Sequence, residues 1–140
     1  MEIKNCFYRV SVKALVLNET RDKFLICKEE DGTWELPGGG LDWGSAPQED
    51  LVREIDEEMG VGVIWVAEHP SYFITGQTLN LKIWVVNVMY EAKLSSLDFK
   101  ASDECVEIRF VNKEDIHELD VFPTVRKLSE MFNPELHRKE

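Results

Sequence analysis

Three glutamates in one short segment are the first indication of chemistry in this 140-residue chain. Glu54, Glu57 and Glu58 are spaced i, i+3 and i+4, so a helix over residues 46–60 would place them on one face. A separate apolar stripe of that helix is expected to face a core: Leu51, Val52, Ile55 and Met59. Like charges on one helix face repel each other, and a divalent cation such as Mg²⁺ or Mn²⁺ would relieve the repulsion. The alternative is a solvated acidic helix face.

A glycine-rich stretch precedes the acidic segment. Pro37 followed by Gly38, Gly39 and Gly40 is expected to end any regular element there, and its backbone can approach a ligand closely. Further along, Ser45 is a candidate cap for the helix start. Pro47 suits the first helical turn and Gly60 the helix end. The sequence therefore predicts a tight loop leading directly into the acidic helix.

Residues 39–61 (GGLDWGSAPQEDLVREIDEEMGV) resemble the Nudix box, the signature of the Nudix hydrolase family, to which MutT-like proteins belong. Eight of the nine specified positions match at the expected spacing: Gly39, Arg53, Glu54, Ile55, Glu57, Glu58, Gly60 and Val61. The departure is Ser45, which stands where the box has its first glutamate. Asp42 or Glu49 could compensate for that change, or Ser45 could cap the helix instead.

This resemblance implies an α/β (α+β) fold of the Nudix type, an α/β/α sandwich with a mixed β-sheet. It implies metal-dependent hydrolysis of a pyrophosphate bond in a nucleoside diphosphate linked to another moiety, such as a nucleoside triphosphate, nucleotide sugar or dinucleotide. Glu54, Glu57 and Glu58 would bind Mg²⁺ (or Mn²⁺), Glu54 and Arg53 would be catalytic, and Arg53 would orient a glutamate. A Nudix-fold nucleotide-binding or sensor domain with weak catalysis is the alternative that Ser45 favours.

Other candidate site residues lie outside the acidic helix. Family members often add a base or metal ligand from a later loop, and Glu104 is the candidate here, with Glu107 second and an exposed acidic loop as the alternative. Gly38, Gly39 and Gly40 are candidates for substrate binding. Trp43, within the box loop, is the tryptophan most expected to contact a nucleobase. Tyr72 and Phe73 lie in a stretch that resembles a loop.

The remaining pattern predicts one domain over residues 1–140, with five to seven strands and two or three helices. Strands are expected at residues 9–18, 23–28, 33–36, 61–67, 80–93 and 106–111, with a hairpin turn between the first two. Residues 113–119 suggest a helical turn and residues 124–132 a helix. The histidines (His69, His117 and His137) show no metal-binding spacing and are expected at the surface, and residues 133–140 are expected to fray.

Composition limits the partners. A net charge of −11 argues against a large nucleic-acid footprint, although divalent cations can bring a small nucleotide-type substrate into an acidic pocket. No apolar run is long enough to span a membrane and the N-terminus lacks a signal-peptide pattern, so we expect a cytoplasmic protein without a membrane partner. Cys6, Cys27 and Cys105 are expected to be buried or idle thiols. A homodimer is left open.

Overall fold

The computed structural model describes residue 2 and residues 6–139. Over these residues the chain forms strands in two sheets, two α-helices and short 3₁₀ helices at Asp115–Glu118 and Pro134–His137. The strands and α-helices are β1 (Arg9–Leu15), β2 (Phe24–Lys28), β3 (Trp34–Glu35), β4 (Gly38–Gly40), α1 (Pro47–Met59), β5 (Val63–Val66), β6 (Tyr72–Gln77), β7 (Trp84–Leu94), β8 (Glu107–Val111) and α2 (Pro123–Met131).

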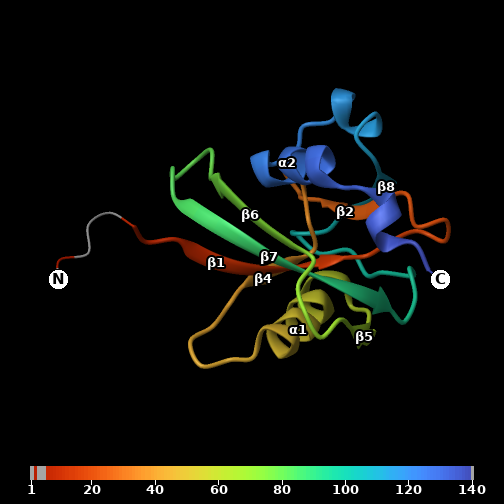
Figure 1. Ribbon diagram of the computed structural model, residues 1–140, viewed down its shortest axis with the longest axis horizontal. Coiled ribbons are helices and arrows are strands. Elements are labelled where there is room, and N and C mark those ends of the chain that lie inside the picture. Colours follow the sequence, from red (N-terminus) through yellow and green to blue (C-terminus); the bar gives the residue numbers. More distant parts are fainter. Residues whose placement is uncertain (1, 3–5, 140) are drawn as a thin grey trace.

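The larger sheet is mixed. In it, β1 pairs antiparallel with β4 and parallel with β7, and β7 pairs antiparallel with both β5 and β6 on its other edge. A smaller antiparallel sheet has the order β3-β2-β8. Helix α1 lies on one side of the mixed sheet and α2 on the other (Figure 1). The predicted sandwich of helices around a mixed sheet is confirmed.

Two apolar cores hold the layers together. Leu51, Ile55 and Met59 of α1 are fully buried against one face of the mixed sheet, and Val125 and Leu128 of α2 belong to the core on the other face. The predicted apolar stripe of the first helix is therefore confirmed at three of its four positions. It is wrong for Val52, which is 39% exposed.

Helix α1 begins and ends close to the predicted residues. Pro47 occupies its first turn, and Gly60 ends it with a left-handed φ of 65° while donating its N–H to the carbonyl of Asp56. The expected cap by Ser45 is wrong, because the residue at the cap position is Ala46 and no side chain caps the helix start. Pro47 lessens the need for a cap, since it has no N–H to satisfy.

The glycine stretch is a strand rather than the end of regular structure. Gly38–Gly40 forms β4, with Gly38, Gly39 and Gly40 opposite Lys13, Val12 and Ser11 of β1. The prediction was wrong because an extended glycine stretch can still pair when a neighbouring strand has free backbone groups.

Four expectations for the second half of the chain are also wrong. Residues 80–83 form a hairpin turn, so β7 begins at Trp84, and Tyr72 and Phe73 belong to β6 rather than to a loop. Instead of being at the surface, His137 is 8% exposed and lies within hydrogen-bond distance (2.7 Å) of the Tyr72 hydroxyl. This contact and the 3₁₀ helix Pro134–His137 order the tail that was expected to fray; Glu140 lies outside the described residues.

The expected turn between the first two strands is present, since the N–H of Asn18 donates to the Lys23 carbonyl. Direct pairing there is limited to a bridge between Leu17 and Phe24, because β1 and β2 belong to different sheets.

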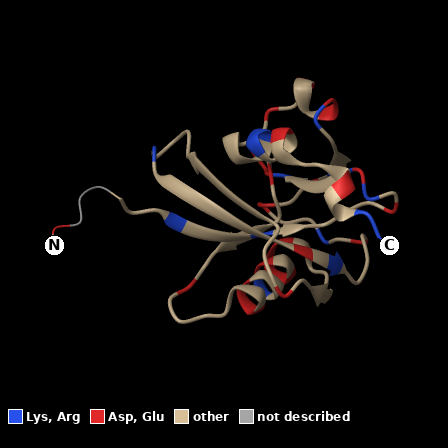
Figure 2. Ribbon diagram, in the orientation of Figure 1, with Lys and Arg blue, Asp and Glu red and all other residues tan. Residues whose placement is uncertain are grey.

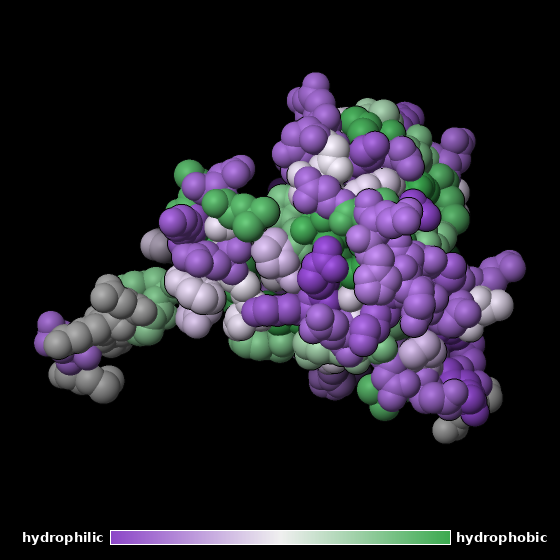
Figure 3. Space-filling model, turned by 90° about the horizontal axis from the view of Figure 1, so that it is seen from above, coloured by the Kyte–Doolittle hydropathy of each residue, from purple (hydrophilic) through white to green (hydrophobic). Residues whose placement is uncertain are grey.

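The surface is largely hydrophilic on the face above α2, with hydrophobic side chains showing through in several places (Figure 3). Exposed apolar residues occur at the β6–β7 hairpin, where Leu79 and Leu81 are 66% and 75% exposed. None of the described helices is long and apolar enough to cross a membrane. Whether a second copy of the chain covers any of this surface stays a prediction.

Candidate active site

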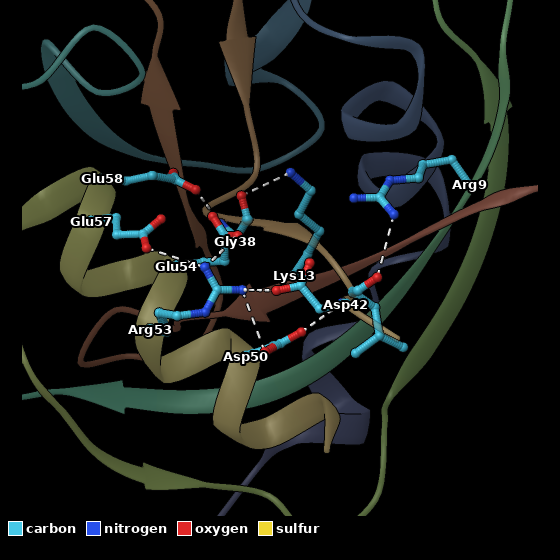
Figure 4. Close-up of polar contacts among 10 residues, drawn as sticks. Arg9, Lys13, Gly38, Asp42, Asp50, Arg53, Glu54, Glu57 and Glu58 are labelled. Atoms are coloured by element: carbon cyan, nitrogen blue, oxygen red, sulfur yellow. Dashed lines mark hydrogen bonds and ion pairs between the residues drawn. The ribbon is translucent and has the colours of Figure 1, made fainter. Parts of the chain in front are cut away.

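Arg53 is the centre of a charged cluster on α1. One of its guanidinium nitrogens lies 3.1 Å from an Asp42 carboxylate oxygen and 3.4 Å from one of Asp50, and the other lies 3.3 Å from Glu54 and 3.2 Å from Glu57 (Figure 4). A planar guanidinium can serve several carboxylates because its donors are held in a fixed fork. Arg53 therefore links the loop before α1 to the acidic face of the helix.

Two of the three predicted metal-binding glutamates face the glycine strand β4. Glu58 is 4% exposed and accepts the N–H of Gly38 at 3.2 Å. The Glu54 carboxylate packs against Gly39 so closely that a Cβ there would lie 2.8 Å from Oε1 and nearer still to the rest of the group. The close approach of β4 to Glu54 thus leaves no room for a side chain at Gly39, whereas a Cβ at Gly38 would meet β1.

The same approach changes the proton affinity of both groups. Burial is the main cause that raises the pKa of Glu58 to about 8, and Glu104 raises it further, while Lys13 opposes the shift. Burial also raises the pKa of Glu54. Two carboxylates held in a desolvated position gain from a nearby cation, because a positive charge favours their ionised form.

Glu104 reaches the same place from another part of the chain. A cavity of about 240 Å³ is lined by Glu58, Glu104, Gly38, Lys13 and other residues. The loop carrying Glu104 is tied to α1, since the Ser102 hydroxyl donates to the Glu58 carbonyl at 2.7 Å. The chain therefore brings two of the predicted acidic groups, 46 positions apart in sequence, to one cavity.

Other predicted site residues lie away from this cavity. Glu57 has an exposed side chain that points to Arg53, and Trp43 is fully exposed on the loop before α1. Glu107, the second candidate for a base, lies 3.9 Å from Lys28 in an exposed ion pair. Gly40 lies beside Arg9 and not on the cavity wall.

The sequence reasoning missed the residues that complete the cavity. Lys13 is 7% exposed, and its ammonium group donates to the carbonyls of Leu36 and Gly38 at 3.3 Å each. Glu29 and Glu35 line the cavity too, and burial is the main cause that raises the pKa of Glu29. Lys13 had a signal in the sequence, because a lysine between apolar residues of a predicted core strand needs a reason to be there.

The acidic groups of the site differ in how well they are placed to hold a metal ion. As their side chains lie, no three His, Cys, Asp or Glu groups in the described part of the chain stand together as a ready metal site, and Glu57 turns toward Arg53. The chemistry of the donors still fits a hard divalent cation, because the half-buried Glu54 and the buried Glu58 supply carboxylate oxygens in a strongly acidic region (Figure 2). A rotation of Glu57 away from Arg53 would bring a third such oxygen from the same helix face.

Comparison with known proteins gives the site its context. A family model of the NUDIX domain matches residues 7–132. The chain is 33% identical over 151 aligned positions to an RNA pyrophosphohydrolase of Nitratiruptor sp., an alignment that covers 91% of this chain and 95% of that protein. The chain belongs to the NUDIX family.

Other similar proteins support the assignment of this chain to the Nudix hydrolases. It is 28% identical to the nucleoside triphosphatase NudI of Escherichia coli, over 85% of this chain and 92% of that protein. In fold it is similar to the MutT protein from Methanosarcina mazei Go1, with a TM-score of 0.76 at 23% identity over 98% of this chain and 100% of that one. A MutT Nudix hydrolase from Burkholderia pseudomallei has a TM-score of 0.73 at 20% identity, over 91% and 99% of the two chains. As a Nudix hydrolase, the protein is an enzyme of pyrophosphate-bond hydrolysis.

Proposed function

We propose that this Nudix hydrolase cleaves the pyrophosphate bond of a nucleoside diphosphate linked to another moiety, using a divalent cation held by Glu54, Glu57 and Glu58. The observation that carries the proposal is the shared cavity, where Glu58 and Glu104 meet beside Gly38 and Lys13. The names of the relatives support a phosphoanhydride substrate, since one is a pyrophosphohydrolase and another a nucleoside triphosphatase. Mg²⁺ is the cation that we propose, with Mn²⁺ as its substitute.

Each group has a role that its contacts support. Arg53 holds Glu57 by a charge-assisted hydrogen bond and Glu54 by an ion pair, and so orients the carboxylates on α1. Lys13 places a positive charge on the cavity wall, where it can attract a phosphate. A bound divalent cation would neutralise phosphate charge and lower the pKa of the attacking water.

Glu104 is the proton acceptor in this proposal. It is exposed and lines the cavity with Glu58, so it can reach a water that attacks a phosphorus atom there. The hydrogen bond from Ser102 to the backbone of α1 keeps the loop that carries Glu104 near the helix, while the Glu104 side chain stays in contact with solvent. A cytoplasmic location stays a prediction.

The test is release of phosphate or pyrophosphate from a panel of nucleoside triphosphates, dinucleoside polyphosphates, ADP-ribose and other nucleotide sugars. Turnover is measured with Mg²⁺ or Mn²⁺ and with EDTA, for the wild type, Glu54→Gln and Glu104→Gln. The matched control is Asp56→Asn, an exposed carboxylate on another side of the same helix. We expect EDTA to abolish turnover, both glutamine variants to lose about 100-fold or more, and the control to keep wild-type activity.

A binding or sensor domain is the second candidate, because Ser45 replaces the first box glutamate. A folded wild type that binds a nucleotide but turns over nothing on the panel would favour that role and overturn the proposal. Turnover unchanged in Glu104→Gln but lost in Glu54→Gln would remove Glu104 from the mechanism and leave the metal-binding assignment standing.

A further inference from the structure

A second cavity adjoins the first on the α2 side of the mixed sheet. Its volume is about 140 Å³, and it shares Lys13, Glu35 and Phe122 with the cavity that holds Glu58 and Glu104. One water needs only about 10–15 Å³, so this space has room for a group of several atoms. A substrate whose phosphates lie beside Glu58 would extend past Lys13 into it.

The floor of the second cavity carries a polar side chain with no protein partner. Asn87 of β7 lies between Ser11 of β1 and Ile74 of β6, on the face of the sheet that α2 covers, and is 3% exposed. No hydrogen bond joins its carboxamide to another described residue. Since no fully buried side-chain nitrogen or oxygen in the described chain lacks a partner, the Asn87 polar atoms must face the cavity that they line.

Such an arrangement leaves hydrogen-bonding groups free for a ligand. A carboxamide has one acceptor oxygen and two donor hydrogens, and within this cavity only solvent or a bound molecule can satisfy them. Thr124, at the start of α2, is 4% exposed, lines the same cavity and likewise shows no side-chain hydrogen bond to a described residue. Two nearly buried polar groups therefore face one space from opposite sides, the sheet and the helix.

The walls favour a flat, uncharged occupant. Phe122 lines both cavities, and its aromatic side chain is the group there with which a base can stack. The charged groups at the junction, Lys13 and Glu35, lie 3.9 Å apart and offset each other. A carboxamide beside an aromatic ring suits a nucleobase edge that presents a donor next to an acceptor, as asparagine pairs with the N6 and N7 atoms of adenine.

We propose that the second cavity is a base-recognition site in which Asn87 reads the hydrogen-bonding edge of a nucleobase. This inference rests on the proposed function for the position of the phosphates, and it assigns the side chain that distinguishes one base of the substrate from another. Asn87 is then a specificity-determining residue, because its carboxamide forms hydrogen bonds with one base edge and leaves another base with unmatched donors or acceptors.

The test compares ATP, GTP, CTP, UTP and inorganic tripolyphosphate, which has no base, as substrates of the wild type and Asn87→Leu. Leucine is close to asparagine in shape and removes all of its hydrogen bonds. Asn80→Leu, the same substitution at an exposed position of the β6–β7 turn, is the matched control. Thermal unfolding of each variant shows that it is folded before rates are compared.

We expect the wild type to prefer one base and Asn87→Leu to lose about 10- to 100-fold in kcat/KM for that base, chiefly through KM. Turnover of tripolyphosphate should not change, and the control should keep the wild-type preference. Equal kcat/KM for all four bases in the wild type, or an unchanged preference in Asn87→Leu, overturns the inference.

Binding separates this inference from the proposed function. Titration of AMP, GMP, CMP and UMP in EDTA, followed by tryptophan fluorescence or calorimetry, needs no hydrolysis. If the wild type hydrolyses nothing but binds one monophosphate about tenfold or more tightly than the others, and Asn87→Leu abolishes that difference, base recognition stands and the proposed hydrolysis fails. Binding with no base preference, together with no turnover, overturns both.

Discussion

Substitution by alanine at two neighbouring glycines should have different effects in this enzyme: one substitution should lower stability and the other should lower activity. Gly38 and Gly39 are consecutive in β4, and both lie against other parts of the chain. A Cβ at Gly38 would lie 2.9 Å from the Lys13 Cα and closer still to the Val12 carbonyl oxygen, and the φ of Gly38 is 132°. The three atoms nearest to a Cβ at Gly39 would all belong to the carboxylate of Glu54.

The magnitudes follow from what each methyl group would displace. At Gly38 the neighbours are backbone atoms and the conformation is one that alanine rarely adopts, so Gly38→Ala should lower the free energy of unfolding by about 2–6 kcal/mol. At Gly39 the φ is ordinary and the neighbour is the end of a flexible side chain, so Gly39→Ala should change stability by less than about 1 kcal/mol. The Glu54 carboxylate must then retreat by roughly 1 Å to reach normal contact distance.

A shift of that size is large for catalysis. Displacing a positioned group by about 1 Å costs on the order of 100-fold in rate, so Gly39→Ala should lose about that much in kcat/KM while remaining as stable as the wild type. Urea unfolding gives the stabilities, and kcat/KM is measured on whichever substrate the panel identifies. A folded Gly39→Ala enzyme with wild-type kcat/KM, or a Gly38→Ala protein as stable as Gly39→Ala, would refute the reasoning about this contact.

Three further predictions concern charge. Arg53→Lys keeps the positive charge but loses the planar fork that contacts Glu54, so we expect kcat to fall about 10- to 100-fold with little change in stability, checked by kinetics and thermal unfolding. Burial raises the pKa of Glu58 to about 8, so without metal the stability that this shift contributes is present below the unfolded pKa of 4.5 and is lost as the pH rises through 8. Mg²⁺ should therefore stabilise the wild type more at pH 8 than at pH 5 in urea unfolding. Glu58→Gln should not show this difference. Burial lowers the pKa of His137 from 6.5, so its contribution is present above 6.5 and lost as pH falls below that value; denaturant titrations should show an acid loss that His137→Phe lacks.

Local patterns in the sequence were enough to predict α1 and most strands. Proline and glycine fixed the ends of α1, and the 3.6-residue period of Leu51, Ile55 and Met59 identified its buried face. The pairing of β1 with β4 and β7 was out of reach, because strand partners depend on contacts between residues far apart in sequence. For the same reason the glycine strand was mistaken for a loop.

The candidate site was predictable from residue spacing only where one segment supplies it, and Glu104 was a candidate only through the resemblance to the Nudix family. The spacing along one helix predicted that Arg53 and the box glutamates lie close together. Lys13 and Glu29, in contrast, reach the cavity from β1 and from just after β2. Asn87 shows the same kind of signal as Lys13, a polar residue between apolar residues of a strand, but its role depends on its neighbours in the sheet, which the sequence does not give. Trp43 shows the opposite failure, because a large aromatic residue in the right loop is fully exposed and lines neither cavity.

The loss of the first box glutamate is less disruptive than the sequence suggests, because other groups hold the loop before α1. Asp50 is 4% exposed and accepts the N–H of Asp42 at 2.8 Å, while the Asp42 carboxylate lies 3.1 Å from Arg53. Arg53 in turn contacts Glu54, so loop, helix and the carboxylate facing Gly39 form one connected network that does not involve the Ser45 position as a helix cap. A network of charge-assisted hydrogen bonds can fix a loop without a cap. An acidic side chain at position 45 would therefore serve the chemistry more than the fold, and a serine there is compatible with an intact and active box helix.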